Sequence, residues 1–225
     1  MILEQNIKGL CSKHGIDFLE FMNDFEIDHV NELTMYDLEA IAEEYNLSVE
    51  AILFKPLHID SHLNEKLKKI KLLILDVDGV MTDGGMYFTA NGDELKKFNT
   101  KDGMGIMQAI KGGIQIGVIS SGFSDKIVKK RTEMLGIQKC YVGRNSKLKI
   151  LDEWMTEDGI SYEEIAMIGD DINDLEILQK IGISVCPSDA TNEIKSASQI
   201  ILKNKGGDGC IREFIDGYLS HSFKD

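Results

Sequence analysis

From Ile70 onward, short apolar runs of strand length alternate with segments of helical apolar spacing, and this alternation constrains the fold more than any other feature. The apolar runs are Lys71–Val77, Gln115–Ser120, Lys139–Val142, Ile165–Gly169, Gly182–Cys186 and Gln199–Leu202. The helical patterns between them are Met104–Ile110, Asp125–Leu135, Lys147–Thr156, Asp174–Ile181 and Asn192–Ala197. Strands that are apolar throughout are buried on both faces, as in parallel sheets covered by helices. The sequence therefore predicts an α/β domain with a doubly wound parallel sheet.

One pair of segments departs from this alternation and predicts a small β-hairpin after the first strand. Met86–Ala90 and Glu94–Phe98 flank an Asn-Gly dipeptide, which is typical of a type I′ turn. Only about 44 residues separate Asp76, at the end of the first strand, from Ser120, at the end of the second. Because this interval is too short for a large lid domain, we expect the hairpin to stand in place of a cap.

The first 57 residues differ from the rest of the chain in charge and periodicity. They carry twelve acidic residues and three lysines, a net charge of −9. Their apolar residues recur at helical spacing, and Thr34 and Ser48 are candidate N-caps. We predict a small all-α domain over residues 1–57, a linker over 58–69 and the α/β domain over 70–225.

Composition argues against several classes of function. The 225 residues include 25 Lys and Arg against 38 Asp and Glu, a net charge of −13, so the chain lacks the cationic surface that nucleic-acid binding requires. The longest apolar runs have strand length, and no basic segment precedes an apolar one at the N-terminus. We therefore expect neither a membrane span nor a secretory signal. Four cysteines without paired spacing predict free thiols and a cytoplasmic protein.

Polar residues follow the predicted strands at the sheet edge where such folds bind ligands. They are Asp76 and Asp78 after the first strand, Ser120, Ser121 and Gly122 after the second, Lys147 after the third, and Asp170, Asp171 and Asp174 after the fourth. Carboxylates held close together repel one another unless a cation or a proton intervenes, and oxygen ligands suit Mg²⁺. A metal-screened carboxylate can attack phosphorus, a second acid can protonate the leaving alcohol, and a lysine and a hydroxyl can stabilise the phosphoryl oxygens. The set predicts Mg²⁺-dependent phosphoryl transfer.

These stretches resemble the four motifs of the haloacid dehalogenase superfamily of phosphohydrolases. The matching stretches are DVDGVMT from Asp76, VISSG ending at Gly122, Lys147 itself, and GDDIND ending at Asp174. The hairpin, FNTKDGMG from Phe98 and GGDGCIRE from Gly206 resemble the capless branch of 3-deoxy-D-manno-octulosonate 8-phosphate phosphatases and sialic-acid-type 9-phosphate phosphatases. The resemblance covers about Ile70 to Leu219 and implies a haloacid-dehalogenase-like Rossmannoid fold.

The resemblance also implies how the reaction would run. Asp76 would be the nucleophile that forms an aspartyl-phosphate, and Asp78 would be the general acid and base. Ser120 and Lys147 would grip the phosphoryl group.

For the metal, the resemblance implies a site shared by two strand ends. Mg²⁺ would be held by the side chains of Asp76 and Asp170 and by the backbone carbonyl of Asp78, with Asp171 and Asp174 supporting them. Members of this branch are typically homotetramers in which a neighbour's hairpin and the C-terminal tail close the site, so we expect a homotetramer here.

Two departures from the branch concern the substrate. The octulosonate enzymes usually read T-G-R after the second strand, whereas this chain reads Ser120-Ser121-Gly122 and has no arginine there. Their tail usually has an arginine where Asp208 stands. Ser121 and Gly122 remain candidate substrate-binding residues, and Lys101 and Arg212 are candidate partners of a substrate carboxylate. We expect a phosphorylated 2-keto-3-deoxy sugar acid used in lipopolysaccharide or sialic-acid synthesis. 3-Deoxy-D-manno-octulosonate 8-phosphate comes first and a nonulosonate 9-phosphate next.

The fused N-terminal segment keeps an alternative open: a non-catalytic phosphosugar sensor that signals through this segment. A pure binder does not need Asp78 as an acid, which favours the enzyme. Leu33–Leu53 loosely resembles the last two helices of a phage-repressor helix-turn-helix domain. The preceding stretch, where a recognition helix would lie, carries Glu26, Asp28 and Glu32. We therefore expect self-association or partner binding rather than DNA binding.

Overall fold

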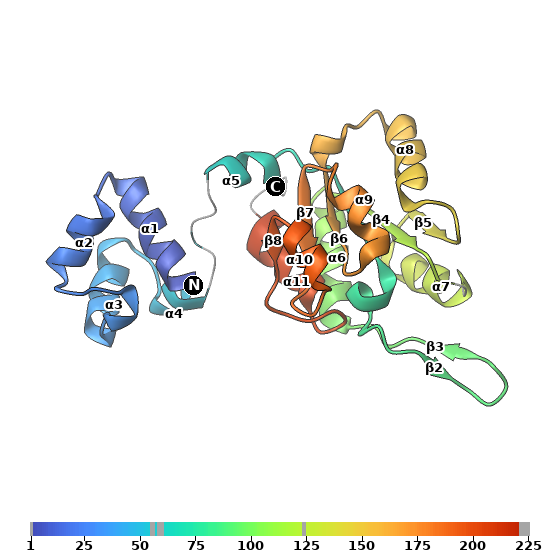
Figure 1. Ribbon diagram of the computed structural model, residues 1–225, viewed down its shortest axis with the longest axis horizontal. Coiled ribbons are helices and arrows are strands. Elements are labelled where there is room, and N and C mark those ends of the chain that lie inside the picture. The colour runs from blue at the N-terminus through green and yellow to red at the C-terminus, as the bar shows by residue number, and fades with distance from the viewer. Residues whose placement is uncertain (1, 55–56, 58–60, 123–124, 221–225) are drawn as a thin grey trace. The chain divides into compact units, whose positions relative to one another are not determined.

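The protein is described from a computed structural model that covers residues 2–54, 57, 61–122 and 125–220. The chain divides into two compact units, residues 1–64 and residues 65–225, each of which is described by itself (Figure 1). In the part of the chain that the structure covers, no helix is both long enough and apolar enough to cross a membrane.

The first unit is built from short helices. They are α1 (Ile2–His14), α2 (Phe18–Asp24), the 3₁₀ turn η1 (Val30–Glu32), α3 (Met35–Glu44) and α4 (Val49–Phe54), with α5 (Ser61–Leu67) at the junction of the units. Thr34 caps α3 through reciprocal hydrogen bonds with Asp37, and the Ser48 hydroxyl accepts the N–H of Ala51 at 3.1 Å. Both predicted N-caps are therefore confirmed. The stretch between α2 and α3, which is described in full, holds only the single turn η1 where a recognition helix would lie.

Six parallel strands form the sheet of the second unit in the order β5-β4-β1-β6-β7-β8. They are β1 (Leu72–Leu75), β4 (Gln115–Ser120), β5 (Lys139–Val142), β6 (Ile165–Ile168), β7 (Ile183–Cys186) and β8 (Ile200–Ile201). The predicted doubly wound sheet is therefore confirmed. The strand order reverses between β1 and β6, and ligands bind at such a reversal because the loops there diverge to opposite faces.

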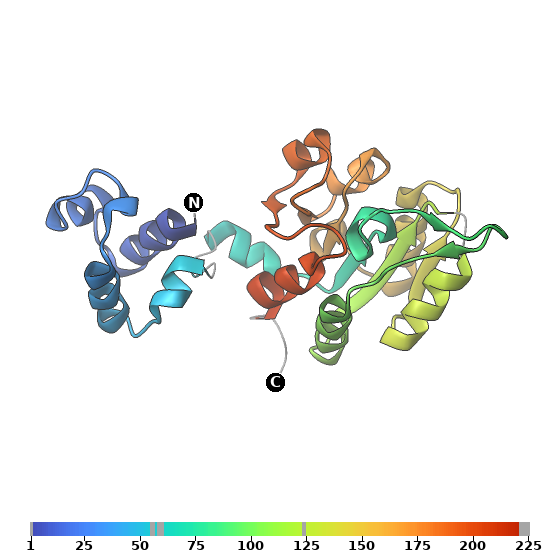
Figure 2. The ribbon, with the colours of Figure 1, turned by 90° about the horizontal axis from the view of Figure 1, so that it is seen from below.

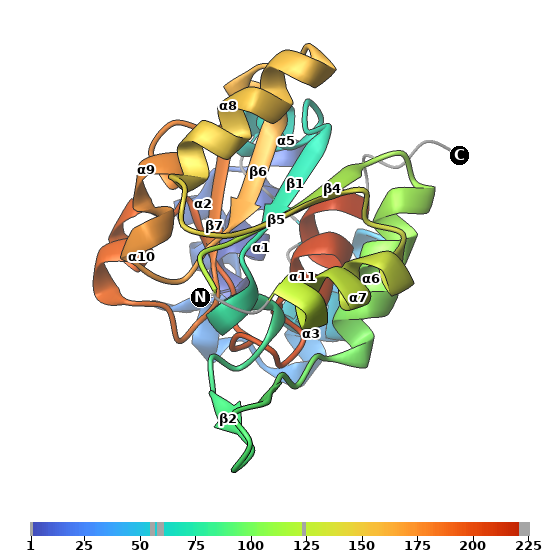
Figure 3. The same ribbon diagram turned by 90° about the vertical axis from the view of Figure 1, so that its right-hand side faces the viewer.

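Helices cover both faces of this sheet (Figure 3). One face carries α6 (Thr100–Lys111), α7 (Asp125–Leu135) and α11 (Cys210–Phe214), and the other carries α8 (Lys147–Asp158), α9 (Leu175–Leu178) and α10 (Asn192–Ala197). All four side chains of the central strand β1 are fully buried between these layers. This burial explains why the strand is apolar throughout and why it positions Asp76 rigidly at its end.

The predicted hairpin is present and extends away from the sheet (Figures 1 and 2). Its strands are β2 (Tyr87–Phe88) and β3 (Glu94–Leu95). The predicted type I′ turn is wrong. The Gly92 N–H donates to the Thr89 carbonyl at 3.0 Å, and Gly92 takes a φ of +86° whereas Asn91 does not take a positive φ. The loop is a type I turn followed by a left-handed glycine, and the Thr89 hydroxyl donates a hydrogen bond across it to the Asp93 carboxylate at 3.1 Å.

Because β1 is fully buried, a substitution that leaves a cavity in this strand should strongly lower the free energy of unfolding. We expect Ile74→Ala to lower the free energy of unfolding by about 2–5 kcal/mol, because the side chain is fully buried. Met134→Ala on α7, where the side chain is 66% exposed, should change it by less than about 0.5 kcal/mol. Urea unfolding followed by the fluorescence of the single tryptophan, Trp154, measures both. Equal effects of the two substitutions would contradict this account of the core.

Candidate functional site

The ends of neighbouring strands bring most of the predicted site residues to one edge of the sheet. Asp76 follows β1, Ser120 ends β4, Lys147 begins α8 after β5, and Asp170 follows β6. Carboxylate oxygens of Asp76, Asp170 and Asp174 lie within 4.8 Å of one another. We call these three residues the carboxylate cluster. Its members come from the two sides of the strand reversal, so the tertiary fold is what assembles it.

A buried ammonium group joins the cluster. The Lys147 Nζ atom lies 2.9 Å from Oδ1 of Asp76 and 2.6 Å from Oδ1 of Asp174, and the Lys147 side chain is 3% exposed. The other oxygen of Asp174 accepts the backbone N–H of Asp170 at 3.0 Å. Burial by itself lowers the pKa of Lys147, but the two carboxylates outweigh burial and raise that pKa. Lys147 therefore remains a cation that partly neutralises the cluster.

One ammonium does not balance three carboxylates. Burial, followed by repulsion from Asp174, raises the pKa of Asp76 to about 7. Burial, followed by the charges of Asp76 and Asp174, raises the pKa of Asp170 to about 8. The Oδ1 atom of Asp170 is buried and has no hydrogen-bond partner among the described residues. Excess negative charge and an unpartnered buried oxygen, in a set of oxygen donors, fit a divalent cation such as Mg²⁺.

The turn after β1 brings two strand ends into close contact at Gly79. This residue has a φ of +90°, and a Cβ atom there would lie 2.0 Å from Oδ2 of Asp170. Only glycine allows both the backbone conformation and the close approach of this carboxylate. The glycine of the D-x-D-G sequence is therefore required by the contact with the β6 loop.

The C-terminal segment packs against the same turn. A Cβ atom at Gly206 would lie 1.9 Å from the carbonyl oxygen of Gly79. The segment is held by the buried Asp102 of α6, whose carboxylate accepts the N–H groups of Gly209 at 3.2 Å and Arg212 at 2.8 Å. Burial raises the pKa of Asp102 in spite of these hydrogen bonds. Asp102 lies in the FNTKDGMG stretch, but the sequence assigned it no role, because the helix whose N–H groups it accepts lies more than 100 residues away.

Lys96 of the hairpin is a second residue that the motifs did not reveal. Its side chain is 5% exposed, and its Nζ atom pairs with Oδ1 of Asp78 and lies 2.9 Å from Oε1 of Glu94. Lys96 directly follows β3 and pairs with Glu94, two residues earlier, whereas Leu95 between them is 58% exposed, so buried and exposed side chains alternate here. That alternation is the sequence signal that could have identified the pair.

The contacts described for the remaining predicted residues lie outside the carboxylate cluster. The Gly122 N–H donates to Oγ of Ser120 at 3.1 Å, and Ser121 lies between them, half-buried. Asp171 is exposed, and its carboxylate accepts the N–H of Ile172. Lys101 is exposed in the first turn of α6, and the guanidinium of Arg212 pairs with Asp216 at 2.6 Å on the C-terminal helical segment.

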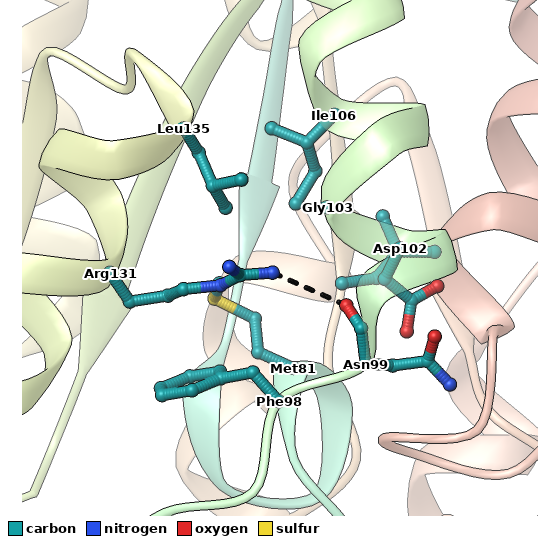
Figure 4. A pocket seen from close by; sticks show the side chains of 9 residues that line it. Met81, Phe98, Asn99, Asp102, Gly103, Ile106, Arg131 and Leu135 are labelled. Carbon is teal, nitrogen blue, oxygen red and sulfur yellow. Dashed lines mark hydrogen bonds between the residues drawn. The ribbon is translucent and has the colours of Figure 1, made fainter.

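A small hollow lies at the base of the hairpin (Figure 4). Its lining includes Met81, Phe98, Ile106 and Leu135, with the guanidinium of Arg131 among them. The Arg131 guanidinium donates to the Asn99 carbonyl at 3.3 Å and lies 5.5 Å from the centre of the Phe98 ring. These contacts of Arg131 fix the segment that joins the hairpin to α6, so we assign the hollow a structural role.

The raised carboxylate pKa values predict a stability that depends on pH. Both groups bind protons more tightly in the folded protein, so their contribution to the free energy of unfolding is lost as the pH rises from about 4 to about 8. We therefore compare the free energies of unfolding of Asp170→Asn and the wild type in a chelating buffer. The variant's free energy of unfolding, relative to that of the wild type, should rise by at least about 1 kcal/mol from pH 5 to pH 8, since one pKa unit is about 1.4 kcal/mol. Urea unfolding at both pH values measures this, and a pH-independent difference would contradict the assignment.

With this geometry established, similarity to known proteins becomes informative. Residues 141–214 match the haloacid dehalogenase-like hydrolase family. The 3-deoxy-D-manno-octulosonate 8-phosphate phosphatase of Salmonella typhi is 37% identical over 158 residues, which is 70% of this chain and 84% of that protein.

Solved structures show the same similarity. The 3-deoxy-D-manno-octulosonate 8-phosphate phosphatase of Yersinia pestis matches with a TM-score of 0.70 and 34% identity, over 73% of this chain and 88% of that chain. The Moraxella catarrhalis enzyme of the same name was solved with magnesium, phosphate and the octulosonate. It matches with a TM-score of 0.69 and 30% identity, over 72% of this chain and 92% of that chain. The chain therefore belongs to the haloacid dehalogenase-like hydrolases, in the branch that contains these octulosonate phosphatases, and is a phosphatase.

Proposed function

We propose that this phosphatase is a Mg²⁺-dependent phosphomonoesterase that removes the terminal phosphate of a 2-keto-3-deoxy sugar acid. The preferred substrate is 3-deoxy-D-manno-octulosonate 8-phosphate, followed by a nonulosonate 9-phosphate. The observation that carries the proposal is the buried contact of Lys147 with the carboxylate cluster at the strand reversal. The names of the relatives support the choice of substrate.

The proposed reaction uses two carboxylates in succession. An oxygen of Asp76 attacks phosphorus, the bond to the sugar oxygen breaks, and Asp78 gives its proton to the departing alkoxide. Water then attacks the aspartyl-phosphate, Asp78 takes a proton from that water, and inorganic phosphate leaves. Asp76 is 4% exposed, so the phosphorylated carboxylate is shielded from random hydrolysis.

In this proposal, Mg²⁺ would be held by the carboxylates of Asp76 and Asp170 and by the backbone carbonyl of Asp78. Asp174 would support the site through its contacts with Lys147 and the Asp170 N–H, and Asp171 is proposed as a further supporting acid. The unpartnered Oδ1 of Asp170 supports this arrangement. The bound ion would supply charge neutralisation, so that the anionic nucleophile and the phosphate can approach each other.

Substrate binding is proposed for groups on several elements. Lys147 and the hydroxyl of Ser120 contact the phosphoryl oxygens, with Ser121 and Gly122 lining the same loop. Lys101 and Arg212 are the proposed partners of the sugar carboxylate. For Arg212 this requires exchange of its ion pair with Asp216, which lies at the surface and is therefore worth little.

The assignment of Asp76 is tested by phosphate release. With Mg²⁺, the wild type should hydrolyse octulosonate 8-phosphate faster than two nonulosonate 9-phosphates, and these faster than hexose phosphates. Asp76→Asn should lower kcat by more than about 10³-fold, because the amide is not a nucleophile. EDTA should abolish the activity and Mg²⁺ should restore it.

The matched control is Asp152→Asn, at an exposed acid of α8, which should retain activity. Retained activity in Asp76→Asn would remove the nucleophile assignment. Negligible release from every substrate by folded, Mg²⁺-bound protein would favour the sensor that signals through the N-terminal segment.

We further propose that the active form is a homotetramer in the cytoplasm. The hairpin exposes Met86 (65%), Tyr87 (50%), Phe88 (60%) and Leu95 (58%), an apolar surface that a second copy would cover. The four cysteines are free thiols, in keeping with a reducing compartment. Residues 1–57 are proposed as a separate helical domain for self-association or partner binding, joined by a linker over 58–69, and not for nucleic acid.

Sedimentation velocity tests the proposed assembly. The wild type should sediment as a tetramer, and Phe88→Glu should shift it to smaller species, because a charge would be buried in the apolar contact. Met134→Glu, at a comparably exposed position of α7, should leave the tetramer intact. A monomeric wild type would overturn the proposal.

A further inference from the structure

The hairpin delivers one buried cation to the proposed general acid. We propose that Lys96 is a positioning residue that orients the carboxylate of Asp78 toward the leaving group of the substrate. This inference rests on the proposed phosphatase reaction of Asp76 and Asp78. It assigns to the hairpin a task inside its own site, in addition to contacts with a second copy.

The Lys96 ammonium pairs with two carboxylates, one from the turn after β1 and one from the hairpin. The Lys96 ammonium contacts Oδ1 of Asp78 and, at 2.9 Å, Oε1 of Glu94. The Lys96 and Glu94 side chains are 5% and 13% exposed, whereas that of Asp78 is 40% exposed. Glu94 therefore anchors the ammonium within the hairpin, and the more exposed Asp78 gains its fixed orientation from the ammonium.

The pairing also distinguishes the two oxygens of Asp78. While Oδ1 is held by Lys96, Oδ2 faces the loop after β4, where a Cβ atom on Gly122 would lie 3.6 Å from it. The same loop carries Ser120, a proposed phosphoryl ligand, whose hydroxyl accepts the Gly122 N–H. The oxygen left free of the lysine is thus the one that faces the proposed phosphoryl site.

Orientation of this oxygen matters for one kind of substrate more than for another. A sugar alkoxide is a poor leaving group, so the proton on Oδ2 must move to the ester oxygen as the phosphorus–oxygen bond breaks. A p-nitrophenolate spreads its charge over the ring and leaves without a proton. Loss of Lys96 should therefore slow transfer from a sugar phosphate and spare transfer from p-nitrophenyl phosphate.

The neighbouring lysine supplies a matched control. Lys97 follows Lys96 directly in the sequence, is 68% exposed and pairs with Asp83. The experiment compares Lys96→Met, Lys96→Arg and Lys97→Met in the full chain with Mg²⁺. It measures kcat/KM because this constant covers only the steps up to the first transfer to Asp76. The probes are p-nitrophenyl phosphate and octulosonate 8-phosphate, or the sugar phosphate of the panel that the wild type hydrolyses fastest.

We expect Lys96→Met to lower kcat/KM by about 100-fold on the sugar phosphate, the lower end of the range for general acid catalysis, and by less than about 5-fold on the aryl phosphate. Lys96→Arg keeps the charge and should recover most of the loss. Lys97→Met should behave as the wild type on both. The aryl phosphate activity of each variant reports that its site is folded.

Three results would overturn the inference. Equal losses on both phosphates would assign Lys96 a purely structural or phosphate-binding role, and no loss on either would make the ion pair irrelevant to the reaction. A wild type that hydrolyses neither phosphate would overturn the proposed function and this inference with it. Equal losses in an active enzyme would overturn the inference alone.

Discussion

The buried ammonium of Lys147 holds together groups that would otherwise repel one another. It bridges Asp76 after β1 and Asp174 after β6, so the two sides of the strand reversal are joined by one charge. Breaking such a buried pair leaves an uncompensated charge, which is strongly destabilising. Because one cation balances only part of the cluster, the same arrangement that stabilises this edge of the sheet leaves a place for a metal ion and a phosphate.

The chain lacks a large lid domain after the first strand, and two short segments, the hairpin and the C-terminal segment, pack against the turn that follows β1. The hairpin carries Lys96 to Asp78, and Asp102 holds the C-terminal segment against the turn at Gly79. Both are short segments whose positions depend on contacts with the α/β core. These contacts fix both segments on the α/β core, while the apolar side chains of Met86, Tyr87 and Phe88 on the hairpin stay exposed.

Most disagreements between sequence and structure lie at element ends and in the hairpin. The first strand was predicted to reach Val77, but it ends at Leu75, because Asp76 caps a helical turn that begins at Val77. The Asn-Gly dipeptide predicted a two-residue turn, but a hydrogen bond between Thr89 and Asp93 stabilises a three-residue loop. The sequence assigned no role to Lys96 or Asp102, since the groups that they contact, the Asp78 carboxylate and the backbone of α11, lie on other elements.

The sequence by itself determined the class of fold, the order of its elements and the residues at the strand ends, because hydrophobic periodicity and local capping are properties of neighbouring residues. Only the tertiary structure decided which of those polar residues meet. It brought Asp174 into the carboxylate cluster and left Asp171 at the surface, three residues away. It also paired Lys96 with Asp78, whereas Lys97 faces outward. The reason is physical: distances between side chains on separate elements are set by packing and strand order, which no local pattern encodes.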